Sequence, residues 1–334
     1  MTSSPSLEDA LIVGAGPIGL ACAIAARRHG LDPLVIDAGA VVNSVAHYPV
    51  GMHFFTTPDL MEIGDHPLAC AGQKPTREEV LKYYRGVVRA EKLRVRPYTR
   101  LVAATREGPA LRCALEGRRG GAEVRCRRLI LATGYYDHPN LLGVPGEDLP
   151  HVSHRFDEAH LSFGLDVVVI GGKNSAIEAA LELYRAGARV TLVYRGEALK
   201  PSVKYWLKPD IENRLKAGEI AARFGVEVAQ IDAAAVTARH PDGREERLAA
   251  DRVYALIGFH PDFVLFRKIG IELDPGTERP HCDPETLETN VPGVFMAGSI
   301  NAGRATSEIF IENGRFDGEK IFGAKARNPG GTAA

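Results

Sequence analysis

Two segments of the chain repeat one order of elements: an apolar strand, a glycine-rich turn, a helix of small residues and a second strand. The first segment, DALIVGAGPIGLACAIAARRHGLDPLVIDAG, covers residues 9–39, and the second, DVVVIGGKNSAIEAALELYRAGARVTLVYRG, covers residues 166–196. Strands joined in this way through a helix make a parallel sheet that is covered on both faces. The repeat therefore predicts an α/β fold with two Rossmann-like domains.

The first turn carries the full dinucleotide-binding motif G-x-G-x-x-G, with Gly14, Gly16 and Gly19 as its glycines. The first glycine makes the tight turn, the second lets a pyrophosphate approach the backbone, and the third lets the helix pack close to the strand. The helix N-terminus offers free N–H groups and partial positive charge to the phosphates. Asp37, at the end of the second strand, supplies the acid that accepts hydrogen bonds from a ribose.

The second turn departs from this motif. Lys173 replaces the middle glycine, although Ala176 keeps the last position small. No acid follows the second strand, and Arg195 stands there instead. A guanidinium pairs with a 2′-phosphate that an acid would repel, so the second site favours NADP(H) over NAD(H). The competing interpretations are a solvated Arg195 and a Lys173 without a part in binding.

Two dinucleotide sites in one chain predict a redox enzyme. One site holds a flavin that stays bound, the other holds a nicotinamide that comes and goes, and hydride passes between the two rings. A flavin-bound sensor without turnover is an alternative, but it needs no productive nicotinamide site. The complete second unit and Arg195 therefore argue against a sensor.

Composition limits the remaining classes of protein. The 334-residue chain has a formal net charge of −1, which favours neither a nucleic acid nor a membrane as partner. The start, MTSSPSLEDA, lacks the basic and apolar regions of a signal peptide, so we expect a cytoplasmic protein. The five cysteines include no C-x-x-C pair, and the histidines are not spaced as ligands, so we expect no metal.

Further motifs resemble those of thioredoxin-reductase-like flavoproteins. ATGYY at residues 132–136 and ALIGFHPD at residues 255–262 are similar to the two hinges of that family, and TNVPGVFMAGS at residues 289–299 is similar to its second FAD motif. The resemblance implies FAD and NADPH as cofactors and a three-layer ββα architecture with the NADPH domain inserted into the FAD domain. The FAD domain is then expected at residues 1–136 and 259–334, and the NADPH domain at residues 137–258.

Longer stretches resemble one branch, the bacillithiol disulfide reductases, or YpdA/Bdr family. They are HFFTTPDLMEIGDHP, SVKYWLKPDIENRLKAGEI and FIENGRFDG, together with the second turn. A thioredoxin reductase carries C-x-x-C before its second turn, and LPHVSHRFDEAHLSFGLDVVVIGG has no cysteine, which excludes that function. The resemblance implies an NADPH-dependent enzyme that reduces a small-molecule disulfide without a dithiol, and a homo-oligomer, either a dimer or a tetramer.

These motifs assign residues to each cofactor. The residues expected at FAD are Gly14, Gly16, Pro17, Gly19, Asp37, Ala38, Thr133, Gly134, Gly298 and Ser299. The residues expected at NADPH are Gly171, Gly172, Lys173, Asn174, Ser175, Ala176, Tyr194 and Arg195.

Two departures from the family leave the electron acceptor open. Ile18 stands where some members of the branch have a cysteine, and Cys22, one helical turn further on, is expected to pack in the core. We therefore expect no redox-active cysteine. Ser299 stands where the related motif often has an aspartate on the ribityl chain of the flavin. A ferredoxin or flavodoxin reductase-like electron-transfer enzyme is the alternative function, although the C-terminal KARNPGGTAA lacks an aromatic residue to stack on the flavin.

Two further groups of residues have competing interpretations. His53 is a candidate proton donor at the flavin, and the alternative is a packed or surface histidine. Lys204, Trp206 and Lys208 either contact NADPH or an anionic substrate, or they belong to a capping loop before a helix that Pro209 begins.

One prediction concerns structure alone. Residues 100–136 alternate as antiparallel strands that turn near Gly120. A hairpin centred between Arg119 and Gly120 places Cys113 and Cys126 opposite each other, as two free thiols that pack as neighbours.

Overall fold

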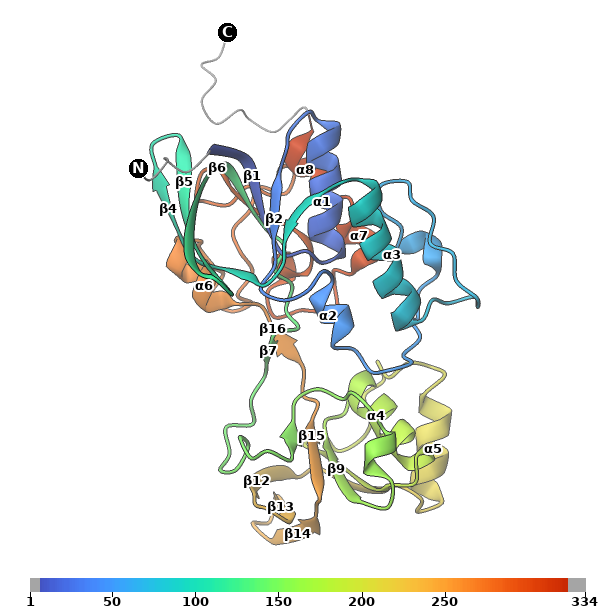
Figure 1. The fold of residues 1–334 in the computed structure, drawn as a ribbon. Coiled ribbons are helices and arrows are strands. Elements are labelled where there is room, and N and C mark those ends of the chain that lie inside the picture. Colours follow the sequence, from blue (N-terminus) through green and yellow to red (C-terminus); the bar gives the residue numbers. More distant parts are fainter. Residues whose placement is uncertain (1–6, 324–334) are drawn as a thin grey trace. The chain divides into compact units, whose positions relative to one another are not determined.

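The computed structural model describes residues 7–323. The chain divides into two compact units, the first formed by residues up to 46, 51–138 and from 259 on, and the second by residues 47–50 and 139–258 (Figure 1). One α/β unit is therefore inserted into another, which confirms the predicted fold class. Residues 1–6 and 324–334, which include the start of MTSSPSLEDA and all of KARNPGGTAA, lie outside the described residues.

A parallel sheet forms the centre of the first unit. Its strands are β1 (Leu7–Val13), β2 (Leu34–Ile36), β3 (Arg94–Arg96), the second half of β6 (Gly120–Leu131) and β17 (Val294–Met296). The order is β3-β2-β1-β6, and β17 pairs with β6. The strand–turn–helix–strand order predicted for residues 9–39 is confirmed.

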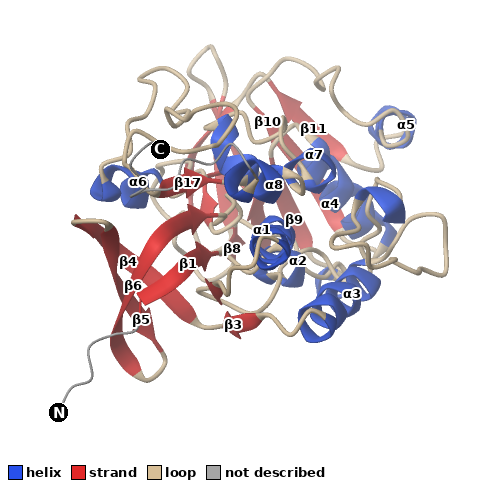
Figure 2. Ribbon diagram, turned by 90° about the horizontal axis from the view of Figure 1, so that it is seen from above, coloured by secondary structure: helices blue, strands red, loops and turns tan. Residues whose placement is uncertain are grey.

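Strand β6 belongs to two kinds of pairing. Its first half runs antiparallel to β5 (Ala110–Gly117), and β5 runs antiparallel to β4 (Thr99–Glu107). Its second half runs parallel to β1. The antiparallel strands expected within residues 100–136 are thus confirmed. Figure 2 shows these strands curling away from the helices that cover β1.

The register of the β5–β6 hairpin differs by two residues from the expected one. Because the turn is residues 118–119, Cys113 lies opposite Val124, and Cys126 lies opposite Leu111. The predicted direct pairing of the two cysteines was therefore wrong. They are diagonal neighbours on one buried face, with their Sγ atoms 3.8 Å apart and both thiols free, as predicted. The contact with Cys113 and burial raise the pKa of the Cys126 thiol.

Helices cover one face of this sheet. Helix α1 (Pro17–Arg28) is buried from Gly19 through Ala26, because its small side chains allow the helix to lie close to the strands. Helix α8 (Asp317–Phe322) packs beside α1 (Figure 1). A Cβ added at Gly318 would lie 2.8 Å from the Cβ of Ala25, so a glycine is required for this approach.

Helix α3 (Arg77–Ala90) begins with a capping box between Thr76 and Glu79, and it precedes β3. Two short helices, α7 (Ile311–Gly314) and α8, follow η3 in the chain. The other elements of this unit are α2 (Asn43–Ala46), η1 (Pro58–Leu60), α6 (Phe263–Ile269) and η3 (Gly298–Ala302). Strands β7 (His138–Pro139) and β16 (Phe259–His260) pair where the chain passes between the units.

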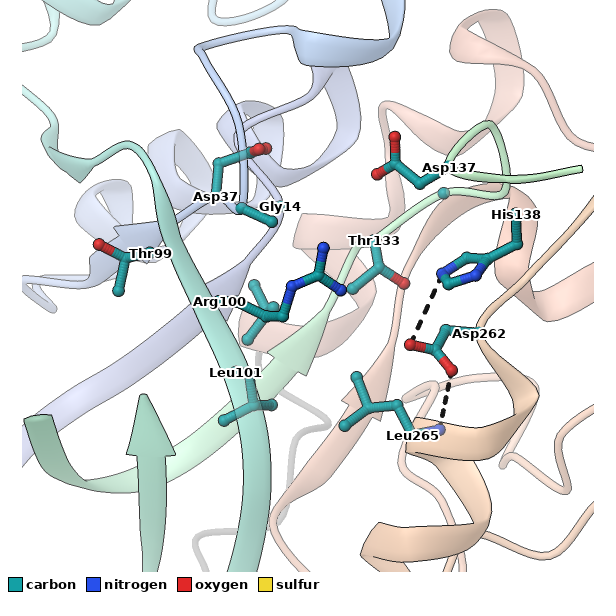
Figure 3. Close-up of a pocket in the computed structure, with 13 residues that line it drawn as sticks. Gly14, Asp37, Thr99, Arg100, Leu101, Thr133, Asp137, His138, Asp262 and Leu265 are labelled. Carbon is teal, nitrogen blue, oxygen red and sulfur yellow. Dashed lines mark hydrogen bonds and ion pairs between the residues drawn. The ribbon is translucent and has the colours of Figure 1, made fainter. Parts of the chain in front are cut away.

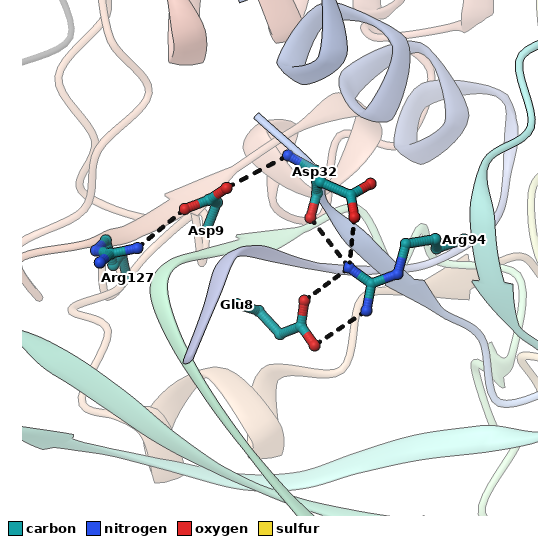
Figure 4. A network of polar contacts seen from close by, with 5 residues as sticks. All are labelled: Glu8, Asp9, Asp32, Arg94 and Arg127. Atoms are coloured by element: carbon teal, nitrogen blue, oxygen red, sulfur yellow. Dashed lines mark hydrogen bonds and ion pairs between the residues drawn. The ribbon is translucent and has the colours of Figure 1, made fainter. Parts of the chain in front are cut away.

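A polar network fixes the amino ends of β1 and β3 (Figure 4). Arg94 donates two hydrogen bonds to the carboxylate of Glu8, at 2.9 and 3.1 Å, and one to the carboxylate of Asp32 at 2.9 Å. Arg127 pairs with Asp9 at 2.9 Å. Glu8 is 7 % exposed, so the bidentate contact compensates for the burial of its charge. These groups are structural, because ligands of such sheets bind at the carboxyl ends of the strands.

The second unit repeats this architecture. Its parallel sheet has the order β11-β10-β9-β15-β8. The strands are β8 (Val152–Ser153), β9 (Asp166–Ile170), β10 (Arg189–Tyr194), β11 (Ala221–Phe224) and β15 (Arg252–Ala255). An antiparallel sheet and the helices complete the unit, with β12 (Glu227–Ile231), β13 (Ala235–Arg239), β14 (Glu245–Ala249), η2 (His160–Ser162), α4 (Asn174–Arg185) and α5 (Lys208–Lys216).

Alternate residues of β9 enter two different cores. Val167 and Val169 pack with the apolar face of α4, whereas Val168 and Ile170 pack with residues of the antiparallel sheet such as Val236. The period of two in a strand sends neighbouring side chains to opposite faces. The parallel sheet therefore lies between a helical layer and an antiparallel sheet, which confirms the three-layer ββα arrangement.

No helix among the described residues combines the length and the apolar character that crossing a membrane requires.

Candidate functional site

The first glycine-rich turn leaves room for a ligand at one position only. Gly14 has φ +114°, and a Cβ there would lie 2.3 Å from the carbonyl oxygen of Ala132. A Cβ at Gly19 would lie 1.8 Å from the carbonyl oxygen of Gly14. A Cβ at Gly16 would meet no atom within 4 Å. Because Gly16 also begins α1 without a side-chain cap, the space above it can take a phosphate at the helix N-terminus.

Asp37 is fixed directly beside this turn. Its carboxylate accepts hydrogen bonds from the backbone N–H of Ala15 and of Gly39, both at 2.7 Å. Burial raises the pKa of the Asp37 carboxyl, and the two backbone bonds oppose that rise. The carboxylate therefore has a set orientation, and its remaining lone pairs can accept ribose hydroxyl groups.

A pocket opens between Asp37, the hinge ATGYY and the start of β4 (Figure 3). Its lining residues are Val13, Gly14, Asp37, Ala38, Thr99, Arg100, Leu101, Thr133, Gly134, Asp137, His138, Asp262 and Leu265. The Oγ1 of Thr133 is buried and has no hydrogen-bond partner among the described residues. A buried hydroxyl without a partner is costly in a finished structure. The residues present thus fit the adenosine half of a dinucleotide.

The structure brings together Gly14, Asp37, Ala38, Thr133 and Gly134 from the predicted first site. Pro17 occupies the first turn of α1.

Gly298 and Ser299 begin η3 and do not line the pocket. The backbone N–H of Gly298 donates to the carboxylate of Asp317 at 2.7 Å. Ser299 has no carboxylate, and the carboxylate that contacts this motif is that of Asp317.

Sequence reasoning missed four charged or titratable residues of the pocket: Arg100, Asp137, His138 and Asp262. Two of them follow the first hinge directly, and Asp262 ends the second hinge, so their place beside the hinges was the available signal. Asp262 accepts a hydrogen bond from the backbone N–H of Leu265 at 2.9 Å and lies 3.6 Å from the Nε2 of His138.

No thiol lines this pocket. Ile18 packs against η3 and α7, since a Cβ added at Gly298 or Gly314 would lie 3.1 or 3.0 Å from its side chain. Cys22 is fully buried, which confirms that it packs in the core. Burial raises the pKa of the Cys22 thiol, so the reactive thiolate is disfavoured.

His53 is exposed and forms an antiparallel bridge with Thr76. It does not line the pocket. Its role as a proton donor stays a prediction.

The second turn is closed by a different set of contacts. Gly171 has φ +144°, and a Cβ there would lie 2.5 Å from the carbonyl oxygen of Leu256. A Cβ at Gly172 would lie 2.5 Å from the ring of Tyr194. Lys173 has extended backbone, with φ −109° and ψ −177°, and is exposed. Extended backbone suits any residue, so lysine is tolerated here without strain.

In the second unit, Tyr194 stands at the position that Asp37 has in the first unit. The sequence suggested Arg195 for this position. The N–H of Gly14 donates to the carbonyl of Ile36, just before Asp37, and the N–H of Gly171 donates to the carbonyl of Val193, just before Tyr194. Arg195 is therefore one residue further along. It is exposed, and no partner for its guanidinium is recorded among residues 7–323.

The loop before α5 is attached to the second turn. The backbone N–H of Lys204 donates to the Oδ1 of Asn174 at 2.9 Å, and its Nζ lies 2.6 Å from Glu178. Pro209 stands in the first turn of α5, as predicted. These contacts favour the capping-loop interpretation for Lys204. Ser175 is exposed beside it.

Within residues 7–323, no cluster of three or more His, Cys, Asp or Glu side chains is arranged to hold a metal ion.

The fold and the two turns define an oxidoreductase with two dinucleotide sites, and the chain belongs to the pyridine nucleotide-disulphide oxidoreductase family, whose model matches residues 11–298. Members of this class use a flavin and a nicotinamide nucleotide. Within it, the chain is a member of the Bdr/YpdA branch. It is 45 % identical over 314 residues to bacilliredoxin reductase Bdr of Bacillus subtilis (strain 168), which covers 94 % of this chain and 96 % of the relative.

A solved structure has the same fold. Bacillithiol disulfide reductase Bdr (YpdA) from Bacillus cereus superposes with a TM-score of 0.92 at 42 % identity, over 95 % of this chain and 98 % of the other. A more distant relative, the ferredoxin–NADP reductase of Ignicoccus hospitalis (strain KIN4/I / DSM 18386 / JCM 14125), is 32 % identical over 309 residues, 88 % of this chain and 90 % of the relative.

Proposed function

We propose that the chain is an NADPH-dependent, FAD-containing enzyme that reduces bacillithiol disulfide without a dithiol of its own. The observation that carries the proposal is the pair of turns, one with free space at Gly16 beside an ordered acid and one with the exposed cations Lys173 and Arg195. The similarity to a bacillithiol disulfide reductase supports the choice of substrate. The family resemblance also favours a cytoplasmic homo-oligomer.

The first unit would hold FAD. Gly16 gives the diphosphate access to the N-terminus of α1, Asp37 binds the ribose of the adenosine half, and the unpaired hydroxyl of Thr133 donates to the cofactor. When bound, FAD supplies a ring that accepts hydride from NADPH and returns two electrons to a disulfide.

The second unit would hold NADPH. Lys173 and the N-terminus of α4 face the diphosphate, Tyr194 takes the place of the ribose-binding acid, and Arg195 pairs with the 2′-phosphate. An exposed guanidinium without a competing carboxylate is free to form this charge-assisted contact.

The absence of a thiol at the first turn shapes the second half of the reaction. Reduction of a disulfide to two thiols consumes two electrons and two protons, and one hydride from NADPH with one proton from solvent balances it. Cys22 is buried and Ile18 is apolar, so neither side chain can form a mixed disulfide. The electrons would therefore pass from the flavin to the substrate without a protein thiol.

A ferredoxin–NADP reductase-like activity is the second candidate, because a relative of that name covers most of this chain. Such an enzyme transfers single electrons and also needs no dithiol.

A stopped-flow experiment separates the two candidates. The holoenzyme is reduced by NADPH while flavin absorbance is followed, and it is then mixed in parallel with bacillithiol disulfide, oxidised ferredoxin or oxygen. We expect the fastest reoxidation with bacillithiol disulfide and a yield of two thiols per NADPH. Reoxidation by ferredoxin alone would replace the proposed function with the second candidate.

A further inference from the structure

We propose that Arg100 clamps the adenine of FAD by stacking its guanidinium on the ring, and that this contact makes the first pocket select FAD over FMN. The inference rests on the proposed function, because it concerns the cofactor assigned to the first unit. None of the motifs includes Arg100, which stands at the second position of β4.

The guanidinium extends from β4 into the pocket beside Asp37 and Thr133 (Figure 3). No hydrogen-bond or ion-pair partner is recorded for it in the part of the chain that the structure describes. An arginine that shares a pocket with carboxylates would ordinarily pair with one of them. Arg100 forms no such pair among the described residues.

Two of the three carboxylates that line the pocket, those of Asp37 and Asp262, are held by other groups. Asp37 accepts from two backbone N–H groups, and Asp262 accepts from the N–H of Leu265 and faces His138. Neither of these carboxylates forms an ion pair with Arg100 in the part of the chain that the structure describes. The guanidinium of Arg100 is therefore left to contact a ligand of the pocket.

The backbone places Arg100 on the base side of the ribose. The N–H of Thr99 donates to the carbonyl of Asp37 at 2.6 Å, so β4 begins beside the acid that would bind the ribose. Arg100 is the residue of β4 that follows Thr99. Gly16 and the N-terminus of α1, which would hold the diphosphate, lie on the other side of that acid. Leu101 and Leu265 add apolar surface to the same pocket. These neighbours favour a base over a phosphate.

The planar shape of the guanidinium makes arginine better suited than lysine to stack on a ring at this position. A guanidinium is weakly hydrated and stacks on aromatic faces, whereas an ammonium is a compact, strongly hydrated point charge. A cation–π contact of this kind contributes roughly 0.5–2 kcal/mol, which corresponds to about 2- to 30-fold in affinity.

The test measures release of FAD from the holoenzymes of three variants. We expect Arg100→Ala to raise the dissociation constant of FAD about tenfold, and Arg100→Lys to recover little of that loss. Arg119→Ala, which removes an exposed arginine from the hairpin turn, is the matched control and should leave the constant unchanged. In exchange experiments with free FMN, the preference for FAD should fall by the same factor in Arg100→Ala.

Three results would overturn the clamp. Arg100→Ala with wild-type affinity for FAD removes any role for the side chain. Arg100→Lys with full affinity assigns Arg100 to a phosphate, since charge alone then suffices. An equal loss in Arg119→Ala shows a general effect of charge. Arg100→Met keeps the length of the side chain and replaces Arg100→Ala if the latter does not fold. A wild-type protein that retains no FAD contradicts the proposed function itself, whatever the variants do.

Discussion

The two glycine-rich turns share a backbone path and differ in the space above it. Gly16 and Lys173 both precede a helix in extended conformation, with φ/ψ of −75°/177° and −109°/−177°. Neither position needs glycine for its backbone. The difference is room, because Gly16 has no atom within 4 Å of its missing Cβ, whereas the side chain of Lys173 occupies the equivalent place in the second turn.

The third position of the motif shows the same contrast. A Cβ at Gly19 would lie 1.8 Å from the backbone of Gly14, but the second turn accommodates Ala176 fully buried. The first helix is therefore packed more tightly on its turn than the second. A tightly packed turn with free space at Gly16 suits a cofactor that stays bound. A less tightly packed turn with the exposed charge of Lys173 suits a cofactor that must leave after each turnover.

The largest effect is expected from closing the tight turn. Gly19→Ala should lower the free energy of unfolding by about 3 kcal/mol, because the backbone oxygen of Gly14 blocks the added methyl group. Urea denaturation of the FAD-free protein measures the change without a contribution from cofactor binding. Gly16→Ala is the matched control, and its effect on unfolding should be within about 1 kcal/mol. Equal effects of the two substitutions would show that the first turn has no more room for a methyl group at Gly16 than at Gly19.

The second largest effect is expected at Arg195, which directly follows β10. Arg195→Ala should raise the dissociation constant of NADPH about 10- to 150-fold, because one charge-assisted contact to the 2′-phosphate is lost. The constant for NADH should hardly change. Titration of both nucleotides against the holoenzyme checks this. A similar loss for NADPH and NADH would make Arg195 a structural residue.

Lys173 should contribute less, because its side chain is exposed. Lys173→Met removes the charge and keeps the bulk, and it should weaken NADPH about threefold at low salt and less at high salt, where exposed charges are screened. Lys173→Gly restores the motif without the charge and separates room from charge. Unchanged affinity in Lys173→Met at both salt concentrations would leave the lysine without a role.

The smallest effect is expected from the cysteines. Cys22→Ala and Cys70→Ala should keep flavin reduction by NADPH and reoxidation by the disulfide within about twofold, because one thiol is buried in α1 and no thiol lines the pocket. Stopped-flow kinetics of both half-reactions measure this. A tenfold loss confined to reoxidation in either variant would reveal a thiol relay.

The sequence by itself determined the two strand–turn–helix units, and its resemblance to thioredoxin-reductase-like flavoproteins implied the inserted arrangement. Glycine at a position with positive φ, apolar runs and small helical residues are local signals, and they predicted β1, α1 and β9 with α4 directly. The absence of a C-x-x-C pair is also a property of the sequence alone.

Only the tertiary structure decided the register and the pocket. A two-residue turn shifted Cys113 from opposite Cys126 to opposite Val124, and strand pairing put Tyr194, not Arg195, at the place of the acid. Arg100 and Asp262 are far apart in sequence and line one pocket, because β4 and the second hinge both border it. Such neighbours depend on how strands pair and where the chain returns after the inserted unit, and no local pattern of residues encodes either.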